Sequence, residues 1–342
     1  MSTAQLAPST PQGPAVTRVR REGTSSWPLI DRVALWLCWG TGIGLCLVAL
    51  AIVLFMLVKG ISYLHLDMLV TSPAPSALQS QSGGILDPIV GTLVVALIGT
   101  LIAAPLGVAI AAWLSEYRRP SWLAHVVESA IEIVAGAPSV VLALFGLLIF
   151  SQGFLGFLSQ TAANGAVYGR SFFAAGIVMA VLALPLVVGS VREALEQLPD
   201  RLREASYALG RTRATTIRRV LLPSIRPSIA TGTVLGMGRI IGDTAIIRIL
   251  LGVSLTNQGV GQLPIIGTLR GTGSTLTSYV YENSPAGEGS APQKAYAAAF
   301  LLLLVVLALN GLVTWLTNAG QHSDRGSRRR LTRILRFKGA RG

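Results

Sequence analysis

The sequence predicts an all-α integral membrane protein with six transmembrane helices, from its composition and its long apolar runs. Of the 342 residues, 51% are hydrophobic and 13% charged, and the mean hydropathy is +0.61. Soluble domains carry about 25% charged residues. About 20 apolar residues cross a bilayer, and six runs reach that length. The predicted spans are Val33–Val58, Ile89–Leu114, Ile131–Phe150, Phe172–Val191, Ile229–Val253 and Ala295–Leu316.

The spans divide the chain into three parts. Residues 1–28 are rich in Ser, Thr, Pro and Gln and are predicted to form a disordered cytoplasmic N-terminus. The first span is longer than the core of a signal peptide, about 7–15 residues, so we expect it to be retained. Residues 29–320 are predicted to form the six-span domain, and residues 321–342 a basic cytoplasmic tail.

The placement of positive charge predicts the orientation. The net charge is +13, and eight arginines lie between residues 192 and 226, with eight basic residues after the last span. The positive-inside rule places that loop and both termini in the cytoplasm. This asymmetry explains the basic composition without nucleic-acid binding. The Arg-rich tail is interpreted as an orientation signal, with contact to anionic membrane lipids as the alternative.

Catalytic and metal chemistry have little support in the sequence. There is no G-x-x-x-x-G-K-[ST] loop to bind nucleotide phosphates, and the three histidines are scattered. Cys38 and Cys46 lie within one span and are expected to pack as small apolar residues. We therefore expect no catalytic residue, metal site or cofactor on this chain.

Two patterns predict packing contacts near the last two spans. Gly232–Gly236 and Gly238–Gly242 are GxxxG pairs in the fifth span, and such pairs let another helix approach closely. Tyr279 and Tyr281 lie in the outer loop of about residues 254–294. We expect these tyrosines at the membrane interface, with contact to a partner protein as the alternative.

The 192–226 loop carries the most informative soluble pattern. Its apolar residues recur at intervals of three and four, which predicts a helix with one apolar stripe. They are Leu195, Leu198, Leu202, Ala205 and Leu209. Gly210 follows as a predicted helix C-cap, and a second short helix leads to the fifth span.

This loop resembles the EAA loop of ABC importer permeases. Glu204, Ala205, Ser206 and Gly210, then Leu222 and Pro223, follow the family spacing E-A-A, three residues, G, nine residues, I-x-L-P, with Ser206 and Val220 as mild departures. The resemblance implies a coupling helix that docks on a separate ATP-binding subunit, with the small residues Ala205 and Ser206 entering its groove. The alternative is an amphipathic helix lying on the membrane.

Two further segments resemble the phosphate-specific branch of that family. Residues 135–141, AGAPSVV, are similar to its A-G-x-P-S segment, and residues 238–245, GRIIGDTA, to the A-R-x-x-G-E-T-A segment of A-type (PstA-like) permeases, with Asp243 in place of Glu. The resemblance implies a bacterial plasma-membrane subunit that imports inorganic phosphate. Its implied partners are a homologous C-type permease, two ATP-binding subunits and an extracytoplasmic phosphate-binding protein.

The fifth span carries three charges, which cost about 2.5–3.5 kcal/mol each at a helix centre. Arg239 and Asp243 are four residues apart and are predicted to pair on one helix face, about 18 Å along the span from Pro227. Arg248 is predicted to point elsewhere and to reach water at the outer end. We interpret Arg239 and Asp243 as a phosphate pathway, and a structural ion pair is the alternative.

Three other functions remain open on the sequence alone. The chain would serve another small anion if the phosphate motifs are not diagnostic, or would be a secondary anion transporter or channel if no ATPase docks on its loop. A purely structural membrane subunit would leave Arg239 dispensable.

Overall fold

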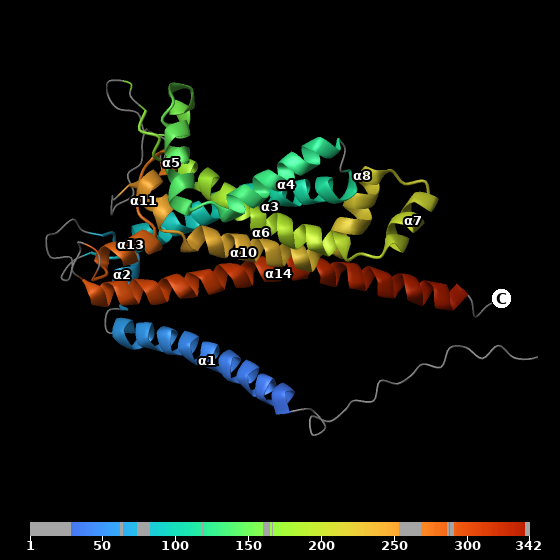
Figure 1. Cartoon of the computed structure of the whole chain (residues 1–342), viewed down its shortest axis with the longest axis horizontal. Helices are drawn as coiled ribbons and strands as arrows, with labels where there is room; N and C mark the ends of the chain where they lie inside the picture. The colour runs from blue at the N-terminus through green and yellow to red at the C-terminus, as the bar shows by residue number, and fades with distance from the viewer. Residues whose placement is uncertain are drawn as a thin grey trace, which may run out of the picture. The chain divides into compact units, whose positions relative to one another are not determined.

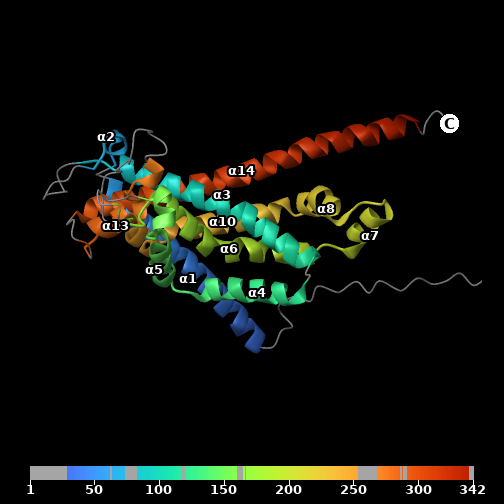
Figure 2. The same ribbon diagram turned by 90° about the horizontal axis from the view of Figure 1, so that it is seen from above.

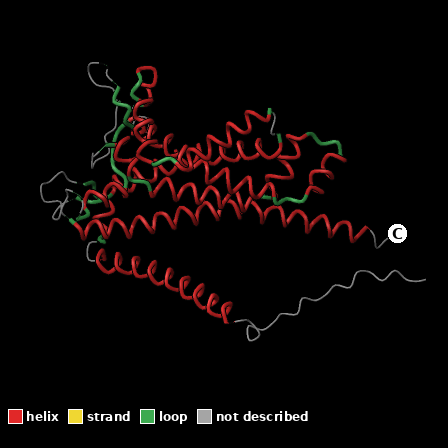
Figure 3. Tube along the Cα trace, viewed as in Figure 1, coloured by secondary structure: helices red, strands yellow, loops and turns green. Residues whose placement is uncertain are grey.

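The computed structural model describes residues 29–61, 64–73, 83–117, 120–159, 165, 167–252, 268–285, 287 and 291–338. Within these residues the chain is helical apart from turns, loops and two isolated bridge positions, as Figure 3 shows. The predicted N-terminal segment 1–28 lies outside the described residues. The all-α class is confirmed for the part of the chain that is described.

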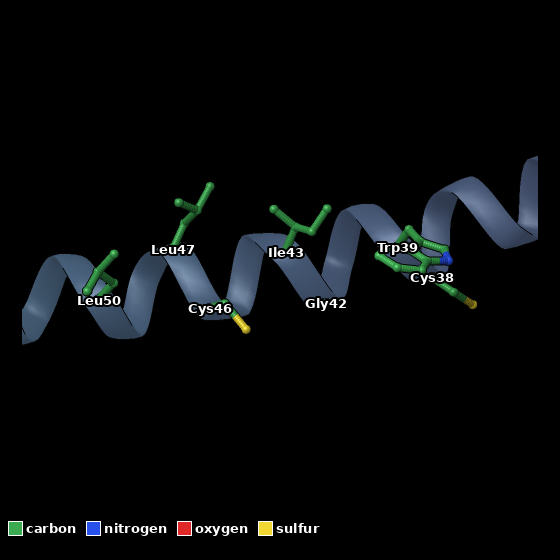
Figure 4. Close-up of a pocket in the computed structure, with 7 residues that line it drawn as sticks. All are labelled: Cys38, Trp39, Gly42, Ile43, Cys46, Leu47 and Leu50. Carbon is green, nitrogen blue, oxygen red and sulfur yellow. The ribbon is translucent and has the colours of Figure 1, made fainter.

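The chain divides into two units, Met1–Leu54 and Phe55–Gly342. The first contains most of helix α1 (Leu29–Gly60), whose most apolar stretch is wholly exposed. A hollow on this helix is lined by side chains of α1 alone (Figure 4). Cys38 and Cys46 are among them, and both are free thiols. Because only one helix lines it, this hollow is a surface groove of a membrane-spanning helix and not a substrate site.

The core of the second unit is built on three helices that run side by side (Figures 1 and 2). They are α3 (Leu86–Glu116), α6 (Phe172–Glu196) and α10 (Arg226–Gly242). Glycines set their close approach. A Cβ on Gly107 of α3 would lie 2.7 Å from Val187 of α6, and one on Gly236 of α10 would lie 3.2 Å from the same valine. Val187 is therefore a point where all three helices meet.

The last helix, α14 (Pro292–Lys338), packs along α10 (Figure 1). Met237 and Ile241 of α10 form the buried centre of this contact, and a row of apolar residues on α14 packs against them. At the same end of the unit as the start of α14 lie two short helices, α2 (Leu66–Val70) and α13 (Leu276–Asn283). The loop between α6 and α10 lies at the other end (Figures 1 and 2).

The predicted third span is not one helix. Helices α4 (Ser121–Gly136) and α5 (Ser139–Phe150) meet at an angle of 113°. Ala137 is extended, with φ −72° and ψ 136°, as expected of a residue that precedes a proline. Pro138 then serves as the N-cap position of α5. The sequence interrupts the predicted span Ile131–Phe150 at Gly136 and Pro138, and the structure bends the chain at this point.

The predicted fifth span is also broken. Helix α10 ends at Gly242, Asp243 is extended with φ −84° and ψ 123°, and a new helix, α11, covers Ala245–Leu251. The predicted span Ile229–Val253 is thus formed by two helices and not by one. The described residues contain four helices long and apolar enough to cross a membrane, or five if the bent α4–α5 pair counts as one, where the sequence predicts six.

Candidate coupling loop and translocation site

The coupling loop begins where Pro199 interrupts the predicted single helix. Helix α6 ends at Glu196, and α7 begins at Asp200 and ends at Ala208. Leu195 is fully buried on α6, whereas Leu209, after α7, is 79% exposed. The predicted apolar stripe is therefore divided between a buried part on the membrane helix and an exposed part on α7.

Gly210 ends α7 as the sequence predicts. Its φ of +72° is left-handed, a conformation that glycine adopts without steric cost. Gly210 N–H donates to Tyr207 O (2.9 Å), and Arg211 N–H donates to Ser206 O (3.2 Å). These two bonds form the Schellman motif, which satisfies the last carbonyls of a helix.

Ser206 is buried within the loop. It is 4% exposed, and its hydroxyl lies 2.8 Å from that of Thr216 on α8 (Arg213–Thr216). The prediction that Ser206 enters a partner's groove with Ala205 conflicts with this burial, because the side chain ties α7 to the next helix. Glu204 and Ala205 are exposed.

Leu222 and Pro223 lie in the second arm of the loop. After α8 the chain forms a π-helical turn, η4 (Ile217–Leu221), and a short helix, α9 (Leu222–Ser224). Leu222 packs against a buried cluster that includes Leu221 and residues of α3 and α6. The Leu-Pro end of the loop thus anchors it to the membrane helices.

Apolar side chains on and beside α7 are left exposed by the described part of the chain. Leu202 and Tyr207 are 38% and 40% exposed, next to the exposed Leu209. Exposed apolar side chains on an otherwise polar helix are typical of a protein interface. The loop therefore has one arm fixed to the bundle and one presented outward.

Arg239 is exposed on α10. Gly232 and Gly236 are buried against α6, whereas Leu235 and Arg239 are exposed. Arg239 forms no hydrogen bond or ion pair with any residue that the structure describes. The GxxxG prediction holds for the first pair alone, since a Cβ added to Gly238 or Gly242 would meet no atom of the described chain within 4 Å.

Asp243 does not pair with Arg239. It lies beyond the end of α10, and its Oδ1 accepts a hydrogen bond from Ile246 N–H (3.0 Å), which caps the first turn of α11. Asp243 is 8% exposed. The one-face argument failed because it assumed an unbroken helix through residue 243.

Arg248 pairs with a residue of the loop that the sequence predicts to be the outer one. Its guanidinium forms an ion pair with Glu282 of α13 and lies 4.8 Å from the centroid of the Tyr281 ring. The Arg248 side chain is 29% exposed, so it keeps partial access to water while its charge is paired within the chain. No sequence pattern sets the register between α11 and α13, although Glu282 is one of few acidic residues in that loop.

The segment from Gly271 to Leu276 is hydrogen-bonded to the ends of α3 and α6. Leu276 N–H donates to Thr92 Oγ1 of α3 (2.8 Å), and Phe172 N–H donates to Gly271 O (3.1 Å). Tyr279 is 2% exposed, and burial raises its pKa to about 12. Tyr279 is thus a buried packing residue of the chain itself, contrary to the interfacial position that the sequence suggests.

A helical bundle in which apolar spans are broken is typical of membrane transport proteins. Residues 103–319 match the family described as "Binding-protein-dependent transport system inner membrane component". The chain belongs to this family. It is thus a permease subunit and not an enzyme, since ATP hydrolysis lies on a separate subunit.

Among curated relatives, the chain is similar to "Phosphate transport system permease protein PstA 1" of Mycobacterium tuberculosis (strain ATCC 25618 / H37Rv), with 32% identity over 67% of this chain and 68% of the relative. It is also 31% identical to "Phosphate transport system permease protein PstC" of Haemophilus influenzae, over 52% of this chain and 60% of the relative. The PstA relative supports a PstA-like assignment.

A solved structure shares the fold. A chain of a bacterial alginate ABC transporter, solved in complex with an alginate pentasaccharide-bound periplasmic protein, matches with a TM-score of 0.55 and 19% identity. The match covers 83% of this chain and 94% of that one. At this identity the likeness supports the ABC importer permease fold alone.

Proposed function

We propose that this chain is the A-type permease subunit of an ATP-driven importer of inorganic phosphate. It forms half of the translocation pathway, and a homologous C-type subunit forms the other half. Two ATP-binding subunits and an extracytoplasmic phosphate-binding protein complete the complex. The observation that carries the proposal is the exposed Arg239, without a partner in the described chain, on a broken apolar span.

An arginine within the membrane needs a partner, because an unpaired charge at the helix centre costs about 2.5–3.5 kcal/mol or more. Arg239 finds none in the described chain, and in this proposal its partner is the second subunit or the substrate. A guanidinium presents a planar fork of donors that matches phosphate and stays charged. Phosphate is therefore an anion that this side chain suits.

The breaks in the predicted third and fifth spans support a substrate pathway at the depth of Arg239. Transporters place substrate sites at discontinuous helices near the bilayer midplane. The α10–α11 break begins at Asp243, four residues after Arg239. If each broken segment completes one crossing, the chain has the six spans of the sequence prediction.

The uncovered face of α10 is where we place the C-type subunit. Leu235 is 52% exposed, and Gly238 and Gly242 leave open space beside it. Small residues allow close helix packing in membranes. In this arrangement Arg239 lies at the boundary between the two permease subunits.

The loop at the opposite end is proposed to couple transport to ATP hydrolysis. Glu204, Ala205 and Leu209 are exposed and form the surface offered to an ATP-binding subunit. We infer that this end is cytoplasmic, together with both termini, in a bacterial plasma membrane. The outer end, with α2 and α13, then faces the phosphate-binding protein.

Uptake by the reconstituted complex tests the proposal. Labelled phosphate should enter proteoliposomes only with ATP and loaded binding protein, and excess unlabelled phosphate should suppress this more strongly than sulfate does. A complex with catalytically inactive ATP-binding subunits is the control. Uptake that persists with the inactive subunits would indicate a secondary transporter, and stronger competition by sulfate would indicate another anion.

A further inference from the structure

Arg203 of α7 is turned into the fold, unlike Arg201 on the same helix. Its Nε and Nη2 atoms contact Glu116 Oε1 at 3.0 and 2.9 Å. Glu116 is the last residue of α3, and the side chains of Glu116 and Arg203 are 6% and 18% exposed. Arg201, on the same helix, is exposed and has no hydrogen bond or ion pair with a described residue.

The same guanidinium also binds the end of α6. Nη2 donates to Leu195 O (2.9 Å), and Nη1 donates to Leu198 O (3.2 Å) and to Asp200 Oδ1 (3.1 Å). A cation at a helix C-terminus is favourable because the last carbonyls lack partners and the helix dipole is negative there. Arg203 thus uses all three of its nitrogens to join α7 to the ends of two core helices.

Little else of α7 holds to the membrane helices. The hydrophobic clusters of the described chain contain no residue of Asp200–Ala208. The hydroxyl contact of Ser206 joins α7 only to α8. Arg213, the first residue of α8, also contacts the end of α3, because its Nη1 donates to Glu116 O (3.5 Å). The end of α3 is therefore the fixed point of the loop, and Arg203 is the side-chain link from α7 to it.

We propose that Arg203 is the positioning residue that makes α7 move together with α3 and α6. A displacement of α7 by the ATP-binding subunit would pass through Arg203 to the ends of these two helices. From there it would reach α10 at Val187, where Gly107 and Gly236 bring the three helices together. α10 carries Arg239, so Arg203 links ATP hydrolysis to the phosphate pathway. This inference rests on the proposed coupling function.

Two glutamine substitutions test the link in the reconstituted complex. Arg203→Gln removes all of these contacts, whereas Glu116→Gln removes only the charge on α3 and keeps the carbonyl bonds to α6. The measured quantities are ATP hydrolysis stimulated by the loaded binding protein and the phosphate imported per ATP. We expect hydrolysis to continue while the phosphate imported per ATP falls by roughly 5- to 150-fold, the range of typical coupling free energies.

A double variant and a matched control make the test specific. Arg203→Gln/Glu116→Gln should be no worse than Arg203→Gln alone, because the two residues act through one interaction. Arg201→Gln removes an arginine from the same helix and should leave the ratio unchanged. Arg203→Lys should rescue only in part, since an ammonium cannot serve α3 and α6 at once.

The outcomes separate this inference from the proposed function. An unchanged phosphate-to-ATP ratio in both Arg203→Gln and Glu116→Gln overturns the link, even if wild-type complex imports phosphate. If Arg203→Gln fails to assemble, Glu116→Gln decides alone. If the wild-type complex imports no phosphate, the proposed substrate is wrong. Amide hydrogen exchange then still tests whether Arg203 and Glu116 hold α7 to α3. Exchange of the α7 amides should then accelerate in Glu116→Gln and not in Arg201→Gln.

Discussion

At the scale of single residues, Arg239 is the charge whose removal should affect transport without affecting the fold. Arg239→Ala leaves the packed face of α10 intact, because the side chain is exposed and makes no bond within the described chain. A hydrogen bond to a charged group is worth about 1.5–3 kcal/mol. Labelled-phosphate uptake should therefore fall at least roughly tenfold, with normal assembly. Arg239→Lys should recover little of the uptake, because a lysine ammonium lacks the planar fork of donors.

Normal uptake by assembled Arg239→Ala would assign Arg239 a role outside the pathway. Loss of uptake only through failed assembly would return it to a structural role between subunits. Arg218→Ala is the matched control, because Arg218 is an exposed arginine of the coupling loop and lies outside the fifth span.

Asp243 should matter through the α11 cap. Asp243→Asn keeps an oxygen that accepts from Ile246 N–H, whereas Asp243→Ala removes it. Loss of such a cap costs about 1 kcal/mol. The thermal midpoint of the purified complex should drop for Asp243→Ala and stay close to wild type for Asp243→Asn, and uptake by Asp243→Asn should exceed that by Arg239→Ala. Equal midpoints for the two Asp243 variants would contradict the cap.

Arg248 should matter for stability rather than for the substrate. Arg248→Ala leaves Glu282, which is 13% exposed, without its cation, and a charged group left without its partner costs about 1–3 kcal/mol, less where water reaches it. The thermal midpoint should fall in Arg248→Ala and recover in part in Arg248→Ala/Glu282→Gln. No recovery in the double variant would argue against the pair.

At the scale of elements, the turn after α7 decides where its exposed face points. Gly210→Ala places a Cβ at a φ of +72°, at a cost of about 1–2 kcal/mol, and Gly210→Pro cannot adopt that φ at all. We expect Gly210→Pro to assemble in the membrane but to uncouple ATP hydrolysis from uptake, with a smaller effect for Gly210→Ala. Wild-type uptake by assembled Gly210→Pro would remove the turn from the coupling mechanism.

The face itself is tested by Ala205→Arg. Ala205 is exposed, so an arginine there does not disturb this chain, but it would not fit a groove shaped for a small residue. The permease should insert normally and fail to retain the ATP-binding subunit during purification. Ser206→Ala is the contrasting variant, because it breaks the Thr216 contact inside the loop and should leave docking intact.

Sequence reasoning identified the elements better than their ends and partners. Gly210 was predictable because a left-handed C-cap favours glycine. Pro138 indicated an interruption of the third span, but the sequence could not specify the bend of 113°. The break at Asp243 was missed because an apolar run has no periodicity that reports where a helix stops. Arg203–Glu116 and Arg248–Glu282 were missed for another reason: these pairs join residues 87 and 34 positions apart, and only packing sets such a register.

At the scale of the whole molecule, the second unit connects a loop at one end of its helices to a charge in their middle. Arg203 holds α7 to α3 and α6, and these helices pack on α10 through small residues. The glycines allow backbones to approach closely, and close-packed interiors transmit displacement because they have few voids. The physical path from the coupling loop to Arg239 is therefore a series of direct contacts within one unit.

The orientation of this unit in the membrane is the prediction on which the path depends. Arg201 is exposed beside the coupling face, and Val70, on α2 at the opposite end, is 70% exposed. In a background with Cys38 and Cys46 replaced by alanine, Arg201→Cys should react with an impermeant thiol reagent only after the cells are opened, because the eight arginines of residues 192–226 favour the cytoplasm. Val70→Cys should react in intact cells and serves as the control for the outer side. Ready labelling of Arg201→Cys in intact cells would invert the orientation, and with it the assignment of the coupling loop to an ATP-binding subunit.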